Sequence, residues 1–151
     1  MRIVVQRVTK GSVAWDDRVE TIGPGFVLLV GAGPDDDEAG VRRLADKVAE
    51  LRVFADKAGK MNLSLEDVTG SALVVSQFTL FANMSRGRRP SFIGAGDPKR
   101  AEELYLAFAS RLRERGIQTK TGSFGSHMTV SIENDGPVTL VISSDDWPTR
   151  V

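Results

Sequence analysis

Hydroxyl side chains are the nucleophiles that this sequence offers, because its 151 residues include no cysteine and a single histidine. A serine or threonine hydroxyl needs a neighbouring base before it attacks a carbonyl carbon. The one imidazole, His127, lies in Gly-Ser-His-Met at the start of an alternating segment, without the Gly-x-Ser-x-Gly elbow of common hydrolases. The sequence therefore gives little support to a triad of serine, histidine and acid.

Metal and phosphate-loop chemistry find little support either. Zero cysteines exclude a thiolate zinc site, and one histidine leaves few imidazole ligands for any metal. The acidic run 35–38 is typical of the start of a helix, and residues 145–146 lie near the C-terminus, so neither resembles a pair of catalytic carboxylates. The segment Gly31-Ala32-Gly33 lacks the further glycine and lysine of a phosphate-binding loop. We expect an enzyme without metal or cofactor.

One polar segment, Ser76-Gln77-Phe78-Thr79, stands where functional sites commonly occur. It follows the apolar run 73–75, whose composition predicts a buried strand, and the ends of buried strands often carry sites. Ser76 and Thr79 each offer a hydroxyl group. A small-ester hydrolase that uses one of them is therefore one hypothesis.

The charged residues balance, with twenty Lys and Arg against twenty Asp and Glu. Net charge gives no sign of a polyanionic partner, so any nucleic-acid site must be local. The densest basic segment contains Arg86, Arg88 and Arg89, with Lys99 and Arg100 following. Its side chains either contact the phosphates of an RNA or form a solvated loop, and charge alone leaves both interpretations open.

The elements that must position these residues follow an α+β pattern. Apolar periodicity predicts strands and helices, and Asp97, Pro98 and Gly116 give the second helix an N-cap, a first residue and an end. We expect one domain, 1–151, in which a mainly antiparallel, barrel-like sheet packs against two helices, with a C-terminal tail at 143–151. The predicted strands are 3–13, 19–22, 26–30, 73–75, 128–132 and 138–140, and the predicted helices are 41–51 and 98–115.

Targeting signals are not evident in the sequence. No run approaches the roughly 18 consecutive apolar residues of a membrane span. The first residues also lack the longer apolar stretch of a secretory signal. We expect a soluble protein of the cytoplasm.

Five short segments resemble those of the D-aminoacyl-tRNA deacylase family in order and approximate spacing. They are Gln6-Arg7-Val8, Gly59-Lys60-Met61-Asn62, Ser76-Gln77-Phe78-Thr79-Leu80, Arg89-Pro90-Ser91-Phe92 and Asn134-Asp135-Gly136-Pro137-Val138-Thr139. Each segment alone could occur by chance, and a Gly-Pro pair is usually only a turn. Together, spread from residue 6 to residue 139, they form a specific signature. His127 and the segment 143–151 have no counterpart in that family pattern.

The resemblance implies a homodimer with two equivalent sites. The segment 76–79 then lines each pocket, and Gly136 and Pro137 enter the pocket from the partner subunit. Arg7 is matched by an arginine that supports this Gly-Pro turn, and its guanidinium suits a role in holding turn carbonyls. A surface salt bridge is the alternative role for Arg7.

The implied activity is hydrolysis of the ester in D-aminoacyl-tRNA, and in glycine mischarged on a non-cognate transfer RNA such as tRNA-Ala. In that family the Gly-Pro bond is cis, and the turn aims two backbone carbonyls toward the ammonium group of the substrate. With the amino group and carbonyl fixed, an L side chain points into the turn, a D side chain points to open space, and glycine has neither. A methyl group added at Gly136 is therefore expected to intrude on the space of the substrate.

The chemistry that we expect is backbone catalysis, because no matched segment supplies a base for Thr79. Amides around Phe78 and Thr79 would stabilise the oxyanion, at roughly 3–4 kcal/mol per good donor, while the vicinal ribose hydroxyl assists water. Phe124 and Met128 match a segment beside the family's pocket, and they either contact the terminal adenosine or belong to the core. Two alternatives stay open: a dimeric module that holds tRNA ends without cleaving them, and the small-ester hydrolase that uses Thr79 or Ser76.

Overall fold

Two long antiparallel strands organise the computed structural model, which describes residues 1–85 and 87–144. β1 (Arg2–Trp15) pairs with β8 (Thr129–Ser143) along almost its whole length. The other elements are β2 (Arg18–Ile22), β3 (Gly25–Gly31), α1 (Glu38–Glu50), β4 (Phe54–Ala55), β5 (Met61–Leu63), β6 (Ser71–Ser76), η1 (Phe78–Phe81), α2 (Pro98–Glu114) and β7 (Gln118–Thr121). The predicted elements are present, together with three further short strands, β4, β5 and β7, and a 3-10 helix, η1.

The main sheet has the order β2-β1-β3-β6-β7, with β8 paired to β1 as well. The three pairs made by β1 are antiparallel, in agreement with the mainly antiparallel sheet that the sequence predicts. The pairs β3–β6 and β6–β7 are parallel, which the sequence pattern did not indicate. Parallel neighbours need a crossover connection. Here α1 lies between β3 and β6 in the chain, and α2 lies between β6 and β7.

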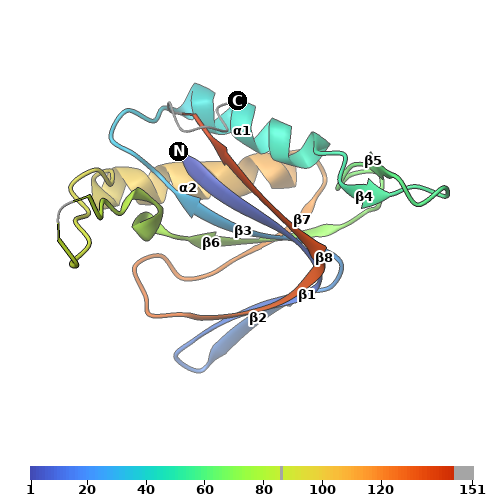
Figure 1. Ribbon diagram of the computed structural model, residues 1–151, viewed down its shortest axis with the longest axis horizontal. Helices are drawn as coiled ribbons and strands as arrows, with labels where there is room; N and C mark the ends of the chain where they lie inside the picture. Colours follow the sequence, from blue (N-terminus) through green and yellow to red (C-terminus); the bar gives the residue numbers. More distant parts are fainter. Residues whose placement is uncertain (86, 145–151) are drawn as a thin grey trace.

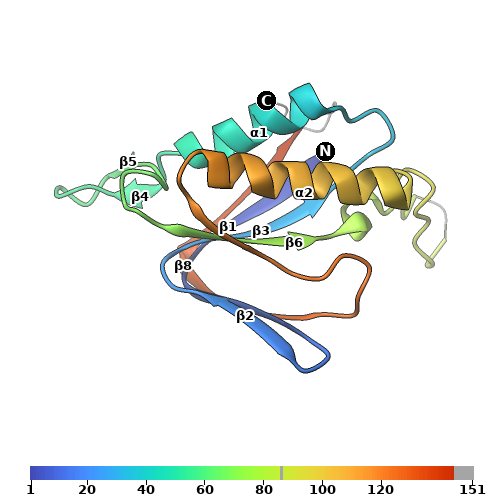
Figure 2. The same cartoon turned by 180° about the vertical axis from the view of Figure 1, so that it is seen from behind.

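The two helices cover one face of the sheet, side by side, in both views of the ribbon (Figures 1 and 2). A large core cluster fills the space beneath them, with Phe26, Phe108 and Leu28 fully buried. A smaller cluster with Val13 and Val27 involves residues of β1, β2, β3 and β6. Partly buried residues of β8 pack against this second cluster, so β8 helps to enclose it.

Local signals set the helix ends where the sequence predicts them. The Asp37 carboxylate accepts a hydrogen bond from Gly40 N at 2.7 Å, and the Asp97 carboxylate accepts one from Arg100 N at 3.1 Å. These bonds satisfy N–H groups that have no intrahelical acceptor. Gly116, just past α2, has a φ of +80°, a backbone conformation that favours glycine. Neither α1 nor α2 is long and apolar enough to cross a membrane.

The two closing strands predicted at 128–132 and 138–140 are one strand, β8, which corrects that prediction. Gln6 faces Thr139 while Val8 faces Asn134, so residues 135–138 all lie opposite the single residue Arg7. We call residues 135–138 the β8 bulge. Ser143, which the sequence placed in a tail, closes β8 opposite Arg2 and is buried. Residues 145–151 of the expected tail lie outside the described residues.

Candidate active site and the bulge of strand β8

A cavity of about 610 Å³ opens beside the end of β6. Ser76, Gln77 and Phe78 line one side of it, as the sequence predicts. Phe124 and Met128 line it as well, so the structure places both beside the predicted catalytic segment. Thr79 is exposed and does not line the cavity. Ala95, Gly96, Pro98 and Ala101, in the loop before α2 and its first turn, complete one wall.

Two backbone N–H groups next to this cavity are left without partners. Gln77 N donates to Val30 O at 2.8 Å and ends the sheet, after which η1 begins. Within η1, the first backbone N–H group that donates a hydrogen bond is that of Leu80, which donates to Gln77 O at 3.3 Å. No side chain caps η1. Within the described chain the N–H groups of Phe78 and Thr79 therefore have no acceptor, because the first N–H groups of any helix lack one.

The hydroxyl of Thr79 is engaged by the neighbouring amide. Gln77 Nε2 donates to Thr79 Oγ1, so the threonine oxygen acts as an acceptor. No imidazole or carboxylate of the described residues is hydrogen-bonded to this hydroxyl. Thr79 accordingly lacks the base that a threonine nucleophile requires.

Two pairs of aromatic rings line the cavity. The rings of Phe78 and Phe92 meet edge to face with centroids 5.0 Å apart, and Phe78 is 58% exposed, which suits it to contact a ligand. In the second pair, the rings of Tyr105 and Phe124 have centroids 5.9 Å apart. The Tyr105 hydroxyl donates to Val74 O at 2.9 Å, and burial raises the pKa of this phenol to about 12. Tyr105 therefore stays protonated and holds β6 in place, rather than acting as a base.

His127 also lines the cavity, a position that the sequence did not reveal. Its side chain is exposed, and next to it the hydroxyls of Ser123 and Ser126 lie 2.8 Å apart. In the sequence, His127 stands just before the alternating apolar residues of β8, and this position does not by itself indicate a pocket. The described residues hold no cluster of three His, Cys, Asp or Glu side chains that could bind a metal.

Arg7 lies directly against the β8 bulge. Its Nε is 2.9 Å from Asp135 Oδ2, and its Nη1 donates to the backbone oxygen of Val53. Arg7 Nε makes no hydrogen bond to a described residue, so its contact with Asp135 is an ion pair without hydrogen-bond alignment. The Gly136-Pro137 peptide bond is cis, and Gly136 has a φ of +113°. Asp135, Gly136 and Pro137 are all exposed.

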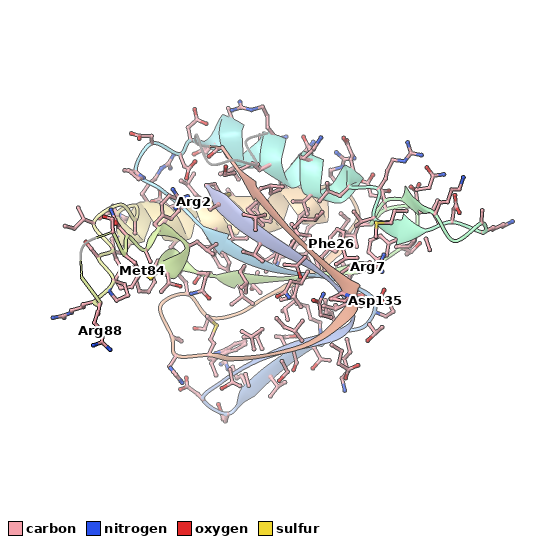
Figure 3. All side chains as sticks on the ribbon, viewed as in Figure 1. Arg2, Arg7, Phe26, Met84, Arg88 and Asp135 are labelled. Carbon is pink, nitrogen blue, oxygen red and sulfur yellow. The ribbon has the colours of Figure 1, made fainter. Side chains whose placement is uncertain are left out.

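Within one chain the bulge and the cavity lie far apart. Arg7 pairs with Phe26 on β3, whereas Ser76 pairs with Val30 on the same strand. Four residues at about 3.3 Å each place these positions about 13 Å apart along β3. Figure 3 shows Met84, which follows η1, near the left end of the molecule and Arg7 and Asp135 in its right half. Neither Gly136 nor Pro137 lines the cavity of its own chain.

The basic segment predicted to contact phosphates forms an exposed loop after η1. An antiparallel bridge between Asn83 and Ser91 closes this loop, and Arg88 and Arg89 are exposed within it. Figure 3 shows the side chain of Arg88 projecting from the loop. Arg86 lies outside the described residues. The loop does not line the cavity but starts within a few residues of it.

Comparisons by sequence give a consistent result. Residues 4–143 match the family described as D-Tyr-tRNA(Tyr) deacylase. A protein named D-aminoacyl-tRNA deacylase from Thermomicrobium roseum is 54% identical over 145 residues, which cover 95% of this chain and 94% of the relative. The protein of the same name from Desulforamulus reducens is 52% identical over 145 residues, with 95% and 97% covered.

Comparisons by structure find the same fold in solved proteins. A structure described as c-Myc DNA Unwinding Element Binding Protein has a TM-score of 0.89 at 38% identity, and the match covers 96% of this chain and 99% of that one. A structure described as a probable eukaryotic D-amino acid tRNA deacylase has a TM-score of 0.84 at 18% identity, covering 93% and 97%. At 18% identity the second likeness concerns the fold alone. The single-domain α+β architecture is thus shared with both.

Proposed function

This chain belongs to the D-Tyr-tRNA(Tyr) deacylase family and is a D-aminoacyl-tRNA deacylase, a hydrolase, and we propose that it combines the backbone amides of one subunit with the β8 bulge of another. The two N–H groups of Phe78 and Thr79 that lack acceptors carry this proposal. Phe78 lines the cavity just past the end of β6, and Thr79 is the next residue along the chain. The substrate ester would place its carbonyl oxygen against these two N–H groups.

Ester cleavage follows from this placement. When water attacks the ester carbon, negative charge develops on the carbonyl oxygen, and donors that already point at that oxygen stabilise the transition state. Water gives up a proton as it attacks, and the ribose oxygen of the terminal adenosine leaves with a proton. The vicinal ribose hydroxyl is the group that assists the attacking water. Thr79 has no catalytic base, and its hydroxyl, which accepts from Gln77, retains a proton to donate.

Selection against L residues is assigned to the β8 bulge of a second subunit. Gly136 and Pro137 are exposed and distant from the cavity of their own chain, so they act only if another chain brings them to its cavity. A two-fold dimer would supply both sites at once. The turn then accepts the substrate ammonium through its carbonyls and occupies the space of an L side chain. A steric filter of this kind admits glycine, so glycyl-tRNA-Ala is a second substrate.

The place of action that fits this function is the cytoplasm, where transfer RNA is charged and used. The proposed reaction needs no metal or cofactor, since its groups are backbone amides, water and a substrate hydroxyl. Two rival hypotheses differ in their products. A binding module would release no amino acid, and a small-ester hydrolase would turn over simple esters without RNA.

Mixed dimers test the arrangement directly. The Gly136→Ala chain keeps an intact cavity, and the Phe78→Pro chain keeps an intact bulge. Each homodimer is expected to deacylate D-aminoacyl-tRNA poorly. An equal mixture, unfolded and refolded together, would form mixed dimers in half of the population, with one good site in each, so on the order of a quarter of wild-type sites should return.

The readout is release of D-amino acid from charged transfer RNA, with light scattering to confirm the dimer and simple esters as a parallel substrate. If the turn acted within its own chain, mixing would restore nothing, because every site would keep one defect. An active monomer at working concentrations, or turnover of simple esters alone, would overturn the proposal. L-aminoacyl-tRNA of the same amino acid serves as the matched control.

The basic loop after η1 is expected to hold phosphates of the transfer RNA. Charge reversal in Arg88→Glu or Arg89→Glu should weaken binding and lower the slope of log affinity against log salt by roughly one per lost phosphate contact. Arg18, an exposed arginine at the start of β2, provides the control variant Arg18→Glu. Binding titrations at several salt concentrations measure the slope. Equal slopes in all three variants and the wild type would place the RNA path elsewhere.

A further inference from the structure

The carboxamide of Asn134, at the base of the β8 bulge, has each of its hydrogen-bonding positions filled. Its Nδ2 donates to Arg7 O at 2.9 Å and to Val138 O at 3.1 Å. Its Oδ1 accepts from Thr139 Oγ1 at 3.2 Å and from Gln6 Nε2 at 3.4 Å. An asparagine side chain has two donor hydrogens and one oxygen with two lone pairs, so this set is complete.

These bonds hold together Asn134 and Val138, the two residues that bound the bulge, which we call its neck. Asn134 precedes the bulge and Val138 ends it, so the bond between them spans the loop that holds Gly136 and Pro137. The bond to Arg7 O attaches the same amide to β1, at the one residue that faces the whole bulge. The two bonds donated by Nδ2 thus fix both the width of the bulge and its position over β1.

The other contact that holds the bulge is weaker. Arg7 pairs with Asp135, whose side chain is 47% exposed, and Arg7 Nε has no hydrogen-bond alignment toward it. The Arg7 side chain is only 12% exposed, but an ion pair without hydrogen-bond alignment fixes the orientation of the turn less than well-aligned hydrogen bonds do. The backbone ladder with β1 is also irregular here, with register shifts between Gln6 and Val8 and again between Val8 and Lys10. The direction of the exposed turn therefore depends strongly on Asn134.

We propose that Asn134 is a positioning residue for chiral selection, which aims Gly136 and Pro137 at the cavity of the partner subunit without touching the substrate. This inference rests on the proposed function of the bulge as the chiral filter. The side chain of Asn134 points back to β1 and to the neck, toward Arg7, Val138 and Gln6. The turn at Gly136 and Pro137 can exclude L side chains only if it stays in position, and the hydrogen bonds of Asn134 keep it there.

Asn134→Ala removes both bonds that Nδ2 donates, to Val138 O and to Arg7 O, and Asn134→Asp replaces their donor with a charged oxygen that faces these two carbonyls. Both variants should lower the ratio of kcat/KM for D- over L-aminoacyl-tRNA, by about tenfold in Asn134→Ala and by more in Asn134→Asp. The ratio falls because a displaced turn no longer excludes L side chains, while its carbonyls bind the ammonium group of D substrates less tightly. For D substrates we expect KM to rise more than kcat falls, since the amides of Phe78 and Thr79 are untouched.

Gln6→Ala is the matched control. It removes the two 3.4 Å bonds from Gln6, to Asn134 Oδ1 and to Thr139 Oγ1, and leaves both bonds donated by Asn134 and the 3.2 Å bond from Thr139. Its ratio of D over L should stay near that of the wild type. A residue that only stabilised the fold would lower the melting temperature and slow both enantiomers equally. Dimer content and melting temperature are therefore measured for each variant.

The outcomes separate this inference from the proposed function. If both Asn134 variants keep the wild-type ratio while Gly136→Ala loses turnover, Asn134 has no positioning role and the bulge remains the filter. If Gly136→Ala also behaves as the wild type, the proposed function itself is wrong. Should Asn134→Ala and Asn134→Asp not form dimers, Thr139→Val decides in comparison with Gln6→Ala. Both variants lose the 3.4 Å bond between Gln6 and Thr139, but only Thr139→Val loses the 3.2 Å bond to Asn134 Oδ1. An unchanged ratio in Thr139→Val would then overturn the inference, and a smaller fall would support it.

Discussion

Gly136→Ala is expected to lower the turnover of D-aminoacyl-tRNA and glycyl-tRNA by about tenfold to hundredfold. Gly136 has a φ of +113°, which an L residue with a β-carbon rarely adopts. Forcing such a conformation costs about 1–3 kcal/mol, and each 1.4 kcal/mol corresponds to a factor of ten. The bulge relieves this strain by shifting, so the turn no longer meets the partner's cavity in its original position.

The direction of the added methyl group corrects the expectation drawn from sequence. A β-carbon at Gly136 would lie 2.9 Å from Val138 Cγ2 and 3.1 Å from Arg7 Nη2 of its own chain. It would point into the base of the bulge, not outward toward a substrate. The loss of turnover would therefore come from displacement of the turn, and not from a methyl group that enters the substrate's space.

Gly116→Ala provides a control with the same kind of backbone cost. Gly116 has a φ of +80°, and a β-carbon there would meet nothing within 4 Å. It follows α2 and does not line the cavity. We expect Gly116→Ala to lose some stability and to keep the wild-type kcat and preference for D residues. Single-turnover deacylation of D-, L- and glycyl-tRNA, with melting and light scattering, would show whether Gly136→Ala differs from it. A folded, dimeric Gly136→Ala protein with wild-type selectivity would remove the turn from the mechanism.

Phe78→Pro should lower kcat by about a hundredfold to a thousandfold relative to Phe78→Ala, the usual effect of losing one oxyanion donor. Proline removes the N–H group at the first position of η1, where that group has no acceptor in the described chain. A proline is well tolerated at the first position of a helix because its fixed φ is compatible with helical backbone. The preceding residue, Gln77, already has a ψ of 81°, outside the helical region that proline disfavours.

The comparison with Phe78→Ala isolates the amide from the ring. Both variants lose the edge-to-face contact with Phe92, but only the proline variant loses the N–H group. Thr79→Val tests the hydroxyl separately, because it keeps the Thr79 amide and removes the group that accepts from Gln77. We expect Thr79→Val to retain most of the activity. Equal kcat values for Phe78→Pro and Phe78→Ala, or a complete loss in Thr79→Val, would favour a hydroxyl nucleophile over backbone catalysis.

The sequence determined the parts of the fold that depend on neighbouring residues. Helix ends were predictable because a cap bonds an N–H group three residues away, as Asp37 and Asp97 do. The first three strands and the two helix faces followed from the spacing of apolar residues. The short segments from Arg7 to Thr139 were sufficient to indicate the family. The segment 76–78 was correctly placed beside a cavity because polar residues directly follow a buried strand.

Only the tertiary structure decided what depends on pairing between distant residues. The local sequence of 134–137 predicts a turn between two strands, but pairing with β1 on both sides of residues 135–138 makes them a bulge in a single strand. Two parallel strand pairs arise because helical crossovers return the chain to the same sheet, and periodicity carries no information about strand direction. The same pairing sets the bulge about 13 Å from the cavity along β3. The tertiary structure also decided that His127 lines the cavity and that Thr79 does not. Strand register is fixed by contacts between residues far apart in the chain, so the spacing of residues along the sequence does not predict which residues pair.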